Sequence, residues 1–297
     1  MTAVRMTQGL MVSSTLRNLQ MGLSKYADLQ EQLSTGKRVI RASDSPTDAT
    51  ASMRTRVSIA DSEHFVRNAQ NGLGWLTTAD TALSSMGDSL RRARELGIQG
   101  ANGASSSTAS REALATEVDQ IRAELISQAN TTYLGRPIFG GTTAGSVAFD
   151  ATTGAYVGDT GSVQRTIGKD VKVRVDVAGT SVVGPNGASM FDDLAALSTA
   201  LRSGDQTGIS SALDSLANRQ TAVINAQTTV GSTYNRVDNA VQTGQDSLVA
   251  LRTSLSEVED ADLPQTIVDL QMQQVAYQSA LSATSKVMQQ SLIDFLR

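Results

Sequence analysis

The residues best suited to acid–base or nucleophilic chemistry are scarce in this sequence. Its 297 residues include one histidine and no cysteine. A catalytic base needs an orienting partner and a nucleophile nearby, and a metal site needs several clustered ligands. His64 stands beside Glu63 and Arg67 in a stretch with helical spacing. We therefore expect His64 to be a surface residue, and we expect the chain to be no enzyme and to bind no cofactor or metal.

A cluster of carboxylates near the end of the chain is the second group with chemical potential. Its spacing fits no calcium-binding loop and lacks the central glycine of such a loop. Carboxylates also favour the start of a helix, where the helix dipole attracts negative charge. We expect the cluster to begin a helix, with Asp262 as its cap. Its members are Glu257, Glu259, Asp260 and Asp262.

Helix-capping chemistry is clearest near the start of the chain. Gly36 follows the last residue of an apolar stripe, and glycine accepts the left-handed conformation that closes a helix. Ser45 is a good N-cap, and Pro46 suits the first helical position. We interpret Gly36, Ser45, Pro46 and Asp262 as hinge and capping residues. The linkers that contain them, 36–45 and 256–262, are expected to uncouple the terminal segments from a central rod.

The elements between these hinges follow a coiled-coil rhythm, with apolar residues at steps of three and four. The longest run extends from Ile209 to Val258, and a second run extends from Pro46 to about Leu96. A helix of about fifty residues is on the order of 75 Å long, so it needs a partner of matching length. We expect these two helices to pair antiparallel as a rod.

The two terminal segments carry narrower apolar seams. Segments of this kind bury too little apolar surface to fold firmly alone. Binding to neighbouring molecules would supply the missing apolar partner and offset the ordering entropy. The residues expected to form this assembly interface are Leu16, Leu19, Leu23, Tyr26, Leu33, Leu263, Ile267, Leu270, Tyr277, Leu281, Met288 and Phe295.

The sequence changes character in its centre, where glycines punctuate short apolar runs. Val171, Val173, Val175 and Val177 alternate with polar residues, which predicts a half-buried strand. The expected fold class is therefore mainly α with a small β insert. We expect an elongated, coiled-coil-like helical rod with a β-rich domain at its distal end.

This layout predicts a nested domain organisation. The expected domains are an N-terminal assembly helix at 1–35, the two halves of the helical rod domain at 36–134 and 190–258, a small β-rich domain at 135–189, and a C-terminal assembly helix at 259–297.

Composition excludes several classes of partner. The formal net charge of −4 provides no basic field, so we expect no nucleic acid to bind. No apolar run is long enough to span a bilayer. The N-terminus lacks the apolar core of a cleaved signal peptide, so secretion would need another route.

Two stretches resemble a known family. They are LSTGKRVIRASDSPTDA at 33–49 and SEVEDADLPQTIVDLQMQQVAYQSALSATSKVMQQSLIDFL at 256–296. Together with the nested order of segments, they resemble the hook–filament junction proteins of the flagellin superfamily. Flagellin itself typically lacks the proline at position 46 and has a longer variable centre.

The resemblance implies an extracellular structural component of the bacterial flagellum. Such a protein is exported unfolded through the flagellar type III apparatus with the help of an export chaperone. It assembles as a homo-oligomeric ring between hook-associated protein 1 and the flagellin filament, and its terminal segments become helical only in the assembly. The alternatives are a short flagellin that forms the filament itself, and a secreted helical adhesin or effector.

Overall fold

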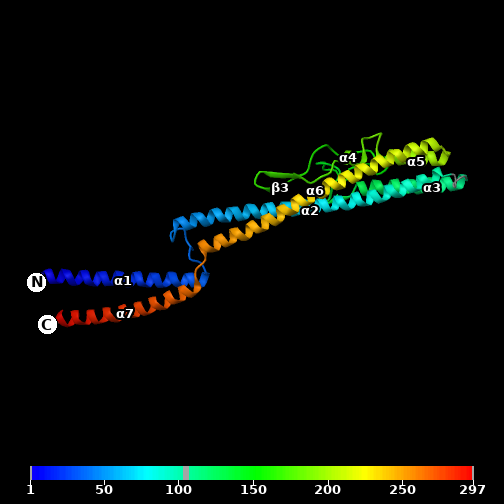
Figure 1. Ribbon diagram of the computed structural model, residues 1–297. Coiled ribbons are helices and arrows are strands. Elements are labelled where there is room, and N and C mark those ends of the chain that lie inside the picture. The colour runs from blue at the N-terminus through cyan, green and yellow to red at the C-terminus, as the bar shows by residue number, and fades with distance from the viewer. Residues whose placement is uncertain (1, 103–106, 296–297) are drawn as a thin grey trace. The chain divides into compact units, whose positions relative to one another are not determined.

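A computed structural model describes the backbone of residues 2–102 and 107–295, and the side chains of Leu10, 13–102 and 107–285 (Figure 1). The expected fold class is confirmed, because long helices dominate and the strands are few and short. The elements are α1 (Thr2–Thr35), α2 (Pro46–Ala101), α3 (Thr108–Ala129), β1 (Thr132–Tyr133), β2 (Arg136–Pro137), β3 (Gln164–Gly168), β4 (Val171–Arg174), α4 (Gly179–Val183), α5 (Met190–Ser203), α6 (Gln206–Glu259) and α7 (Leu263–Phe295).

The chain divides into two compact units. One comprises Met1–Ala60 with Val249–Arg297, and the other comprises Asp61–Leu248. Both divisions fall inside the long helices α2 and α6, so each unit contains part of both. We call them the terminal unit and the central unit.

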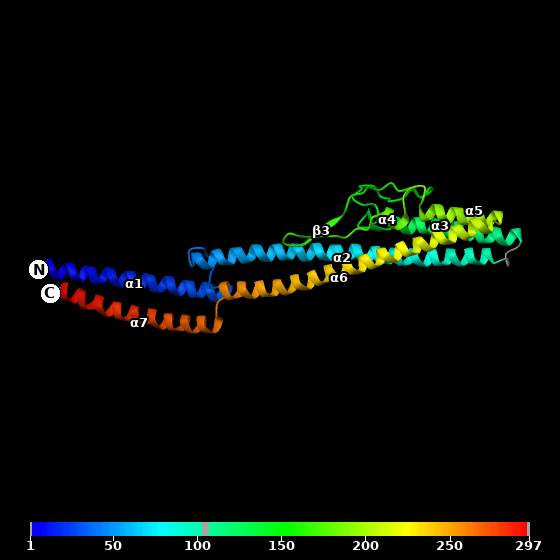
Figure 2. The same cartoon turned by 45° about the horizontal axis from the view of Figure 1, so that its top comes forward.

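In the central unit, α2 and α6 run side by side and antiparallel (Figures 1 and 2). A Cβ atom at Gly72 of α2 would lie 3.8 Å from Val237 of α6, and one at Gly97 would lie 2.7 Å from Leu213. Sequence numbers therefore rise along one helix as they fall along the other. The predicted seams supply the buried core of this pair, which includes Leu76, Leu83, Met86, Leu90, Leu216, Val223, Val230 and Val237.

Helices α3 and α5 pack on each other at one end of this pair. Gly100, near the end of α2, faces Leu201 of α5 and Leu114 of α3. Arg202 of α5 also donates hydrogen bonds to Glu112 at 3.1 Å and to Asp119 at 2.7 Å, both on α3. Helices α3 and α5 therefore cover this end of the α2–α6 pair.

The β-rich segment packs on α3 and α5 at the end of the helical pair, where Arg122 of α3 donates a hydrogen bond to the carbonyl of Thr153 at 2.9 Å. Its β3–β4 hairpin reaches along α2. Strands β3 and β4 form an antiparallel hairpin, and Asn68 of α2 donates a hydrogen bond to the carbonyl of Thr166 at 3.2 Å. Val173 and Val175 are buried, as their alternation predicted, but Val171 is 41% exposed and the strand ends at Arg174, before Val175 and Val177. Val175 packs against Gly72, where a Cβ atom would lie only 3.2 Å away. The absence of a side chain at Gly72 therefore lets the hairpin pack closely on α2. Helices α3 and α5 cover the end of the α2–α6 pair.

In the terminal unit, α1 and α7 pack side by side and antiparallel, with the two chain termini at the same end of the pair (Figures 1 and 2). The Gln273 side chain of α7 donates a hydrogen bond to the carbonyl of Gly22 of α1 at 3.0 Å. Tyr277, one turn further along α7, packs beside the same glycine. Within the described part of the chain, no helix is both long enough and apolar enough to cross a membrane.

Candidate assembly surfaces and junction clasp

The predicted interface residues of the termini divide into two groups. Those that are half-buried are Leu19, Tyr26, Leu33, Leu270 and Tyr277. Those that remain between 43% and 52% exposed are Leu16, Leu23, Leu263, Ile267 and Leu281. Met288 and Phe295 lie on α7, but their side chains are outside the described residues. The α1–α7 pair therefore leaves a substantial part of the predicted interface uncovered, and its use in assembly stays a prediction.

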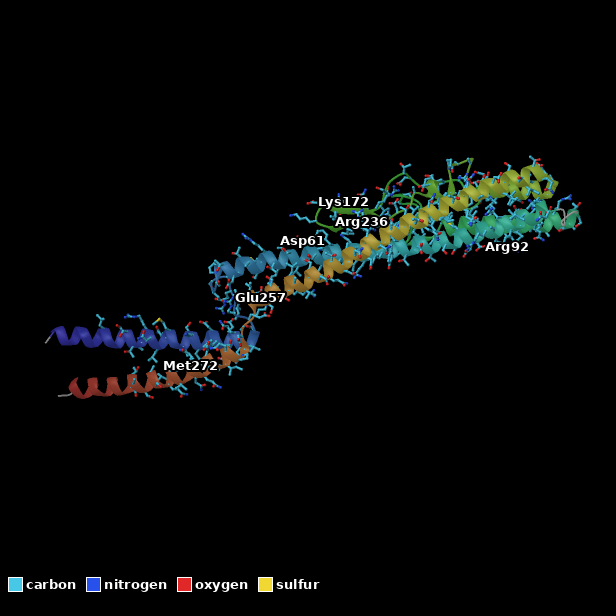
Figure 3. All side chains as sticks on the ribbon, viewed as in Figure 1. Asp61, Arg92, Lys172, Arg236, Glu257 and Met272 are labelled. Carbon is cyan, nitrogen blue, oxygen red and sulfur yellow. The ribbon has the colours of Figure 1, made fainter. Side chains whose placement is uncertain are left out.

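Further exposed apolar side chains on the same helices were missed by the sequence reasoning. On α7, Val268, Met272 and Val275 are 50%, 60% and 63% exposed, and Figure 3 marks the position of Met272. Their spacing of four and three residues is a second helical stripe, which was the signal that could have found them. On α1, Leu10 and Met21 are 69% and 61% exposed. A helix with apolar residues on more than one face is suited to more than one helical neighbour.

The capping geometry expected at the first linker is present. Gly36 has a φ of 69° and donates its backbone N–H to the carbonyl of Gln32, directly after α1 ends. Pro46 is the first residue of α2. The carbonyl of Ser45 accepts the N–H of Ala49 at 2.8 Å, and its hydroxyl lies 3.4 Å from the N–H of Asp48.

The second linker is shorter than expected. Helix α6 continues to Glu259, so Glu257 and Glu259 end a helix and only residues 260–262 form the connection. Asp262 does cap α7, because its carboxylate accepts the N–H of Gln265 at 3.2 Å. Asp260 is hydrogen-bonded to Ser256 at the end of α6, so the expectation that the whole acidic cluster begins a helix was wrong for all its members except Asp262.

Glu259 is stabilised at the C-terminal end of α6 by two cations from other segments. Arg56 of α2 binds its carboxylate through two nitrogens, at 2.8 and 2.6 Å, and the Lys37 ammonium lies 2.9 Å away. The Glu259 side chain is only 7% exposed. We call Lys37, Arg56 and Glu259 the junction clasp. It offsets the unfavourable position of a carboxylate at the negative end of a helix dipole.

The junction clasp shifts the pKa values of Glu259 and Arg56. Hydrogen bonding from Arg56, with a further contribution from Lys37, lowers the pKa of Glu259 to about 2. The same hydrogen bond, which Arg56 donates to the carboxylate, raises the pKa of Arg56. Glu259 and Arg56 therefore both remain charged throughout the physiological pH range.

Backbone hydrogen bonds tie the two linkers together beside this clasp. Arg38 donates its N–H to the carbonyl of Glu259 at 2.7 Å, and Ala261 donates its N–H to the carbonyl of Gly36 at 2.9 Å. Lys37 and Asp260 form an antiparallel bridge. We expected loose linkers that uncouple the terminal segments, but these linkers are hydrogen-bonded to each other and to the end of α6.

Within 2–102 and 107–295, no group of three or more His, Cys, Asp or Glu side chains is arranged to hold a metal ion. His64 is exposed, as expected. What the arrangement provides is apolar helix surface and a charged, hydrogen-bonded junction.

Comparison with protein families gives two matches. The family model of the bacterial flagellin N-terminal helical region matches residues 7–144. The model of the bacterial flagellin C-terminal helical region matches residues 211–296. Both terminal helices and most of α2 and α6 fall inside these matches.

Individual relatives include a hook-associated protein and a flagellin. The chain is 25% identical to flagellar hook-associated protein 3 of Escherichia coli, over 94% of this chain and 96% of that protein. It is 24% identical to a flagellin of Halalkalibacterium halodurans, over 95% of each. Among solved structures, Bacillus cereus FlgL superimposes with a TM-score of 0.60 and 27% identity, over 68% of this chain and 99% of that one.

Proposed function

Because this chain belongs to the flagellin superfamily, we propose that it is the structural protein that joins the hook to the filament of a bacterial flagellum. It assembles there as a ring between hook-associated protein 1 and the flagellin filament. The observation that carries this proposal is the similarity to a hook-associated protein 3 along nearly the whole of both chains.

The uncovered apolar surface of α1 and α7 is the driving force for assembly in this proposal. Side chains such as Met21 and Met272 are about 60% exposed in the single chain. Each large apolar side chain removed from water contributes about 1.5–3 kcal/mol. Neighbouring subunits that cover these faces would offset the entropy of ordering the two termini.

The junction clasp has a mechanical role in this proposal. It links residues just after α1, near the start of α2 and at the end of α6 through a single carboxylate. A load on the terminal helices therefore passes directly into the first turns of α2 and the last turns of α6. A freely jointed linker would not transmit such a load.

Export also follows from the proposed role. The subunit reaches the outside of the cell through the flagellar type III apparatus, without a cleaved signal peptide, and it is extracellular at its site of action. The same exposed apolar faces of α1 and α7 are the segments that an export chaperone would cover before assembly.

Deleting the gene and labelling the chain together test the proposal. We expect the deletion strain to carry hooks without filaments and to release flagellin monomers into the medium. On hooks isolated from the parent strain, an antibody to this chain should label a band at the distal end only.

The second candidate is a short flagellin, which the similarity to a flagellin at 24% identity supports. It predicts antibody label along the whole filament. It also predicts that the deletion strain lacks the filament subunit altogether. Either result would refute the junction assignment.

A further inference from the structure

The methionines of this chain differ in exposure between the two units. In the terminal unit, Met21, Met53 and Met272 are 61%, 61% and 60% exposed. In the central unit, Met86 and Met190 are fully buried. The side chains outside the described residues are those of Met1, Met6, Met11 and Met288. Within the described part of the chain, the thioethers that are open to solvent therefore all lie in the terminal unit.

Two of the exposed methionines lie at the same level of the α1–α7 pair. Met21 directly precedes Gly22 on α1, and Met272 directly precedes Gln273 on α7. Gln273 donates its hydrogen bond to the carbonyl of Gly22 across the pair, at 3.0 Å. A step back of one residue turns each helix by about 100°, and for antiparallel neighbours both turns lead to the same side of the pair. Met21 and Met272 therefore open on one face of the terminal unit.

The same face carries further exposed apolar side chains. Val268 and Val275, four positions before and three positions after Met272, are 50% and 63% exposed. Leu10 lies three helical turns before Met21 on the same side of α1 and is 69% exposed. We call Leu10, Met21, Val268, Met272 and Val275 the methionine face. Thioethers are flexible and polarisable, which suits a surface that must adapt to a neighbouring protein.

A thioether is also the group of this chain that a peroxide oxidises most readily. No cysteine competes for the oxidant, and the only tryptophan, Trp75, is 2% exposed. When a methionine sulfur attacks hydrogen peroxide, an S–O bond forms and the O–O bond breaks. The sulfur loses two electrons, and the second oxygen takes up the proton of the first and leaves as water. The product is methionine sulfoxide, in which a flexible apolar side chain has become polar.

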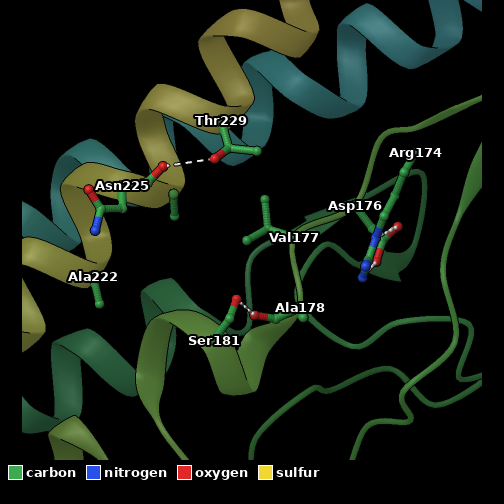
Figure 4. A pocket seen from close by; sticks show the side chains of 9 residues that line it. Arg174, Asp176, Val177, Ala178, Ser181, Ala222, Asn225 and Thr229 are labelled. Carbon is green, nitrogen blue, oxygen red and sulfur yellow. Dashed lines mark hydrogen bonds and ion pairs between the residues drawn. The ribbon is translucent and has the colours of Figure 1, made fainter.

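A groove of the central unit shows the contrast with the methionine face. It has a volume of about 490 Å³, and charged, amide and hydroxyl side chains line it, including Arg174, Asp176, Asn225 and Thr229 (Figure 4). Arg174 is paired with Asp176 at 2.8 Å, and no methionine is among the described residues that line the groove. An oxidant that enters this groove therefore meets no thioether.

We propose that Met21 and Met272 are sites of oxidation by peroxides, and that their sulfoxides keep a free subunit from joining the assembly. This inference rests on the proposed function, because that role requires neighbouring molecules to cover the methionine face. A sulfoxide without a hydrogen-bond donor is costly to bury, so the gain from covering each side chain is lost. In a completed assembly, the same neighbours shield both sulfur atoms from the oxidant.

Peptide mass spectrometry of the purified full-length chain, after limited treatment with hydrogen peroxide, measures the reactivity of each methionine. We expect one added oxygen atom at Met21, Met53 and Met272, whereas Met86 and Met190 should stay unmodified until the chain is unfolded. In isolated flagella treated in the same way, Met21 and Met272 should be protected. Equal rates at all five positions in the folded free chain would overturn the inference, as would unprotected Met21 and Met272 in flagella.

Binding of the purified chain to hooks isolated from the deletion strain measures the consequence of oxidation. Peroxide treatment of the natural chain should raise the concentration for half-maximal binding by about tenfold or more, which corresponds to about 1.4 kcal/mol. The double variant Met21→Leu/Met272→Leu cannot form either sulfoxide, and leucine has a volume close to that of methionine. Each chain is compared with its own untreated sample, so the effect of the substitution itself does not enter the ratio. We expect the ratio of the double variant to stay below about two.

Met53→Leu is the matched control. Met53 is as exposed as Met21, but it lines a groove at the junction with Val39 and Ile40. The control variant should lose binding on peroxide treatment as the natural chain does. Equal losses in the control and the double variant would overturn the inference, and so would undiminished binding of the oxidised natural chain. Failure of the untreated natural chain to bind hooks would instead overturn the proposed function, and the inference with it.

Discussion

At the scale of single residues, the charge of Glu259 stabilises the junction through its ion pairs with Lys37 and Arg56. Its pKa of about 2 lies below the ordinary value of 4.5, so the folded state favours the ionised form. The stabilisation is therefore complete above about pH 5 and is lost as the pH falls towards 2. Since Arg56 and Lys37 come from different segments, this loss loosens the junction rather than one helix.

Replacing Glu259 by Gln should lower the free energy of unfolding of the terminal unit by about 2 kcal/mol at pH 7. Urea unfolding followed by far-UV circular dichroism at pH 7 and pH 3 would measure this. The difference between the variant and the natural chain should shrink at pH 3. Glu31→Gln is the control, because its pair with Arg41 is exposed and should change the free energy by less than about 0.5 kcal/mol. Equal losses of unfolding free energy in both variants would show that the junction clasp stabilises the protein no more than an exposed ion pair does.

At Leu134, unlike at Glu259, a substitution is expected to stabilise the protein. Its φ of 50° and the φ of 77° at Gly135 suit an Asn-Gly turn. Leu134→Asn should therefore raise the free energy of unfolding of the central unit by about 0.5–1 kcal/mol, while Leu134→Val should lower it. Thermal unfolding of both variants would measure the effect. A loss of stability in the asparagine variant would contradict the inference that the backbone of Leu134 is strained.

At the scale of elements, glycines decide where helices and hairpins approach each other. A Cβ atom at Gly74 of α2 would lie 2.8 Å from Cζ of Tyr133, whose ring packs edge-on against Trp75 at 5.8 Å. Gly74→Ala should therefore displace the β1–β2 hairpin and cost about 1–3 kcal/mol. Trp75 is the only tryptophan, so its fluorescence reports the displacement directly.

Gly231→Ala is the matched control on α6. Nothing surrounds its Cβ position, so the change should stabilise the helix by up to about 1 kcal/mol and leave the fluorescence of Trp75 unchanged. If the two alanine variants behaved alike, close packing at Gly74 would not be the cause.

The same elements show what could be predicted from the sequence. The end of α1 at Gly36 and the start of α2 at Pro46 were predictable because capping is a local effect. The end of α6 was not, since the partner that stabilises Glu259 there is Arg56, 203 positions away. The approach of the β3–β4 hairpin to α2 was not foreseeable for a similar reason, because the contact of Gly72 with Val175 joins segments far apart in the sequence.

The terminal surfaces were predictable in part. The seam of α7 was found because its spacing is regular, and a search for one stripe hid Val268, Met272 and Val275. Periodicity identifies an apolar face, but it does not indicate how many neighbours a helix has.

At the scale of the whole molecule, the central unit has its own core and the termini have little. A chain shortened to residues 36–262 should therefore keep cooperative thermal unfolding and the native fluorescence of Trp75. It should also fail to enter flagella, because both terminal helices are absent. Circular dichroism and immunoblots of isolated flagella would measure the two properties. Normal incorporation of the shortened chain would contradict the proposed role of the termini, and loss of cooperative unfolding would contradict the independence of the core.

The bridge between Lys37 and Asp260 has a consequence for how a subunit is added. Because this bridge joins the end of α1 to the start of α7, the two helices cannot enter the growing structure independently. Insertion is then a single event for the pair, and a newly arrived subunit is either fully seated or still free to diffuse away.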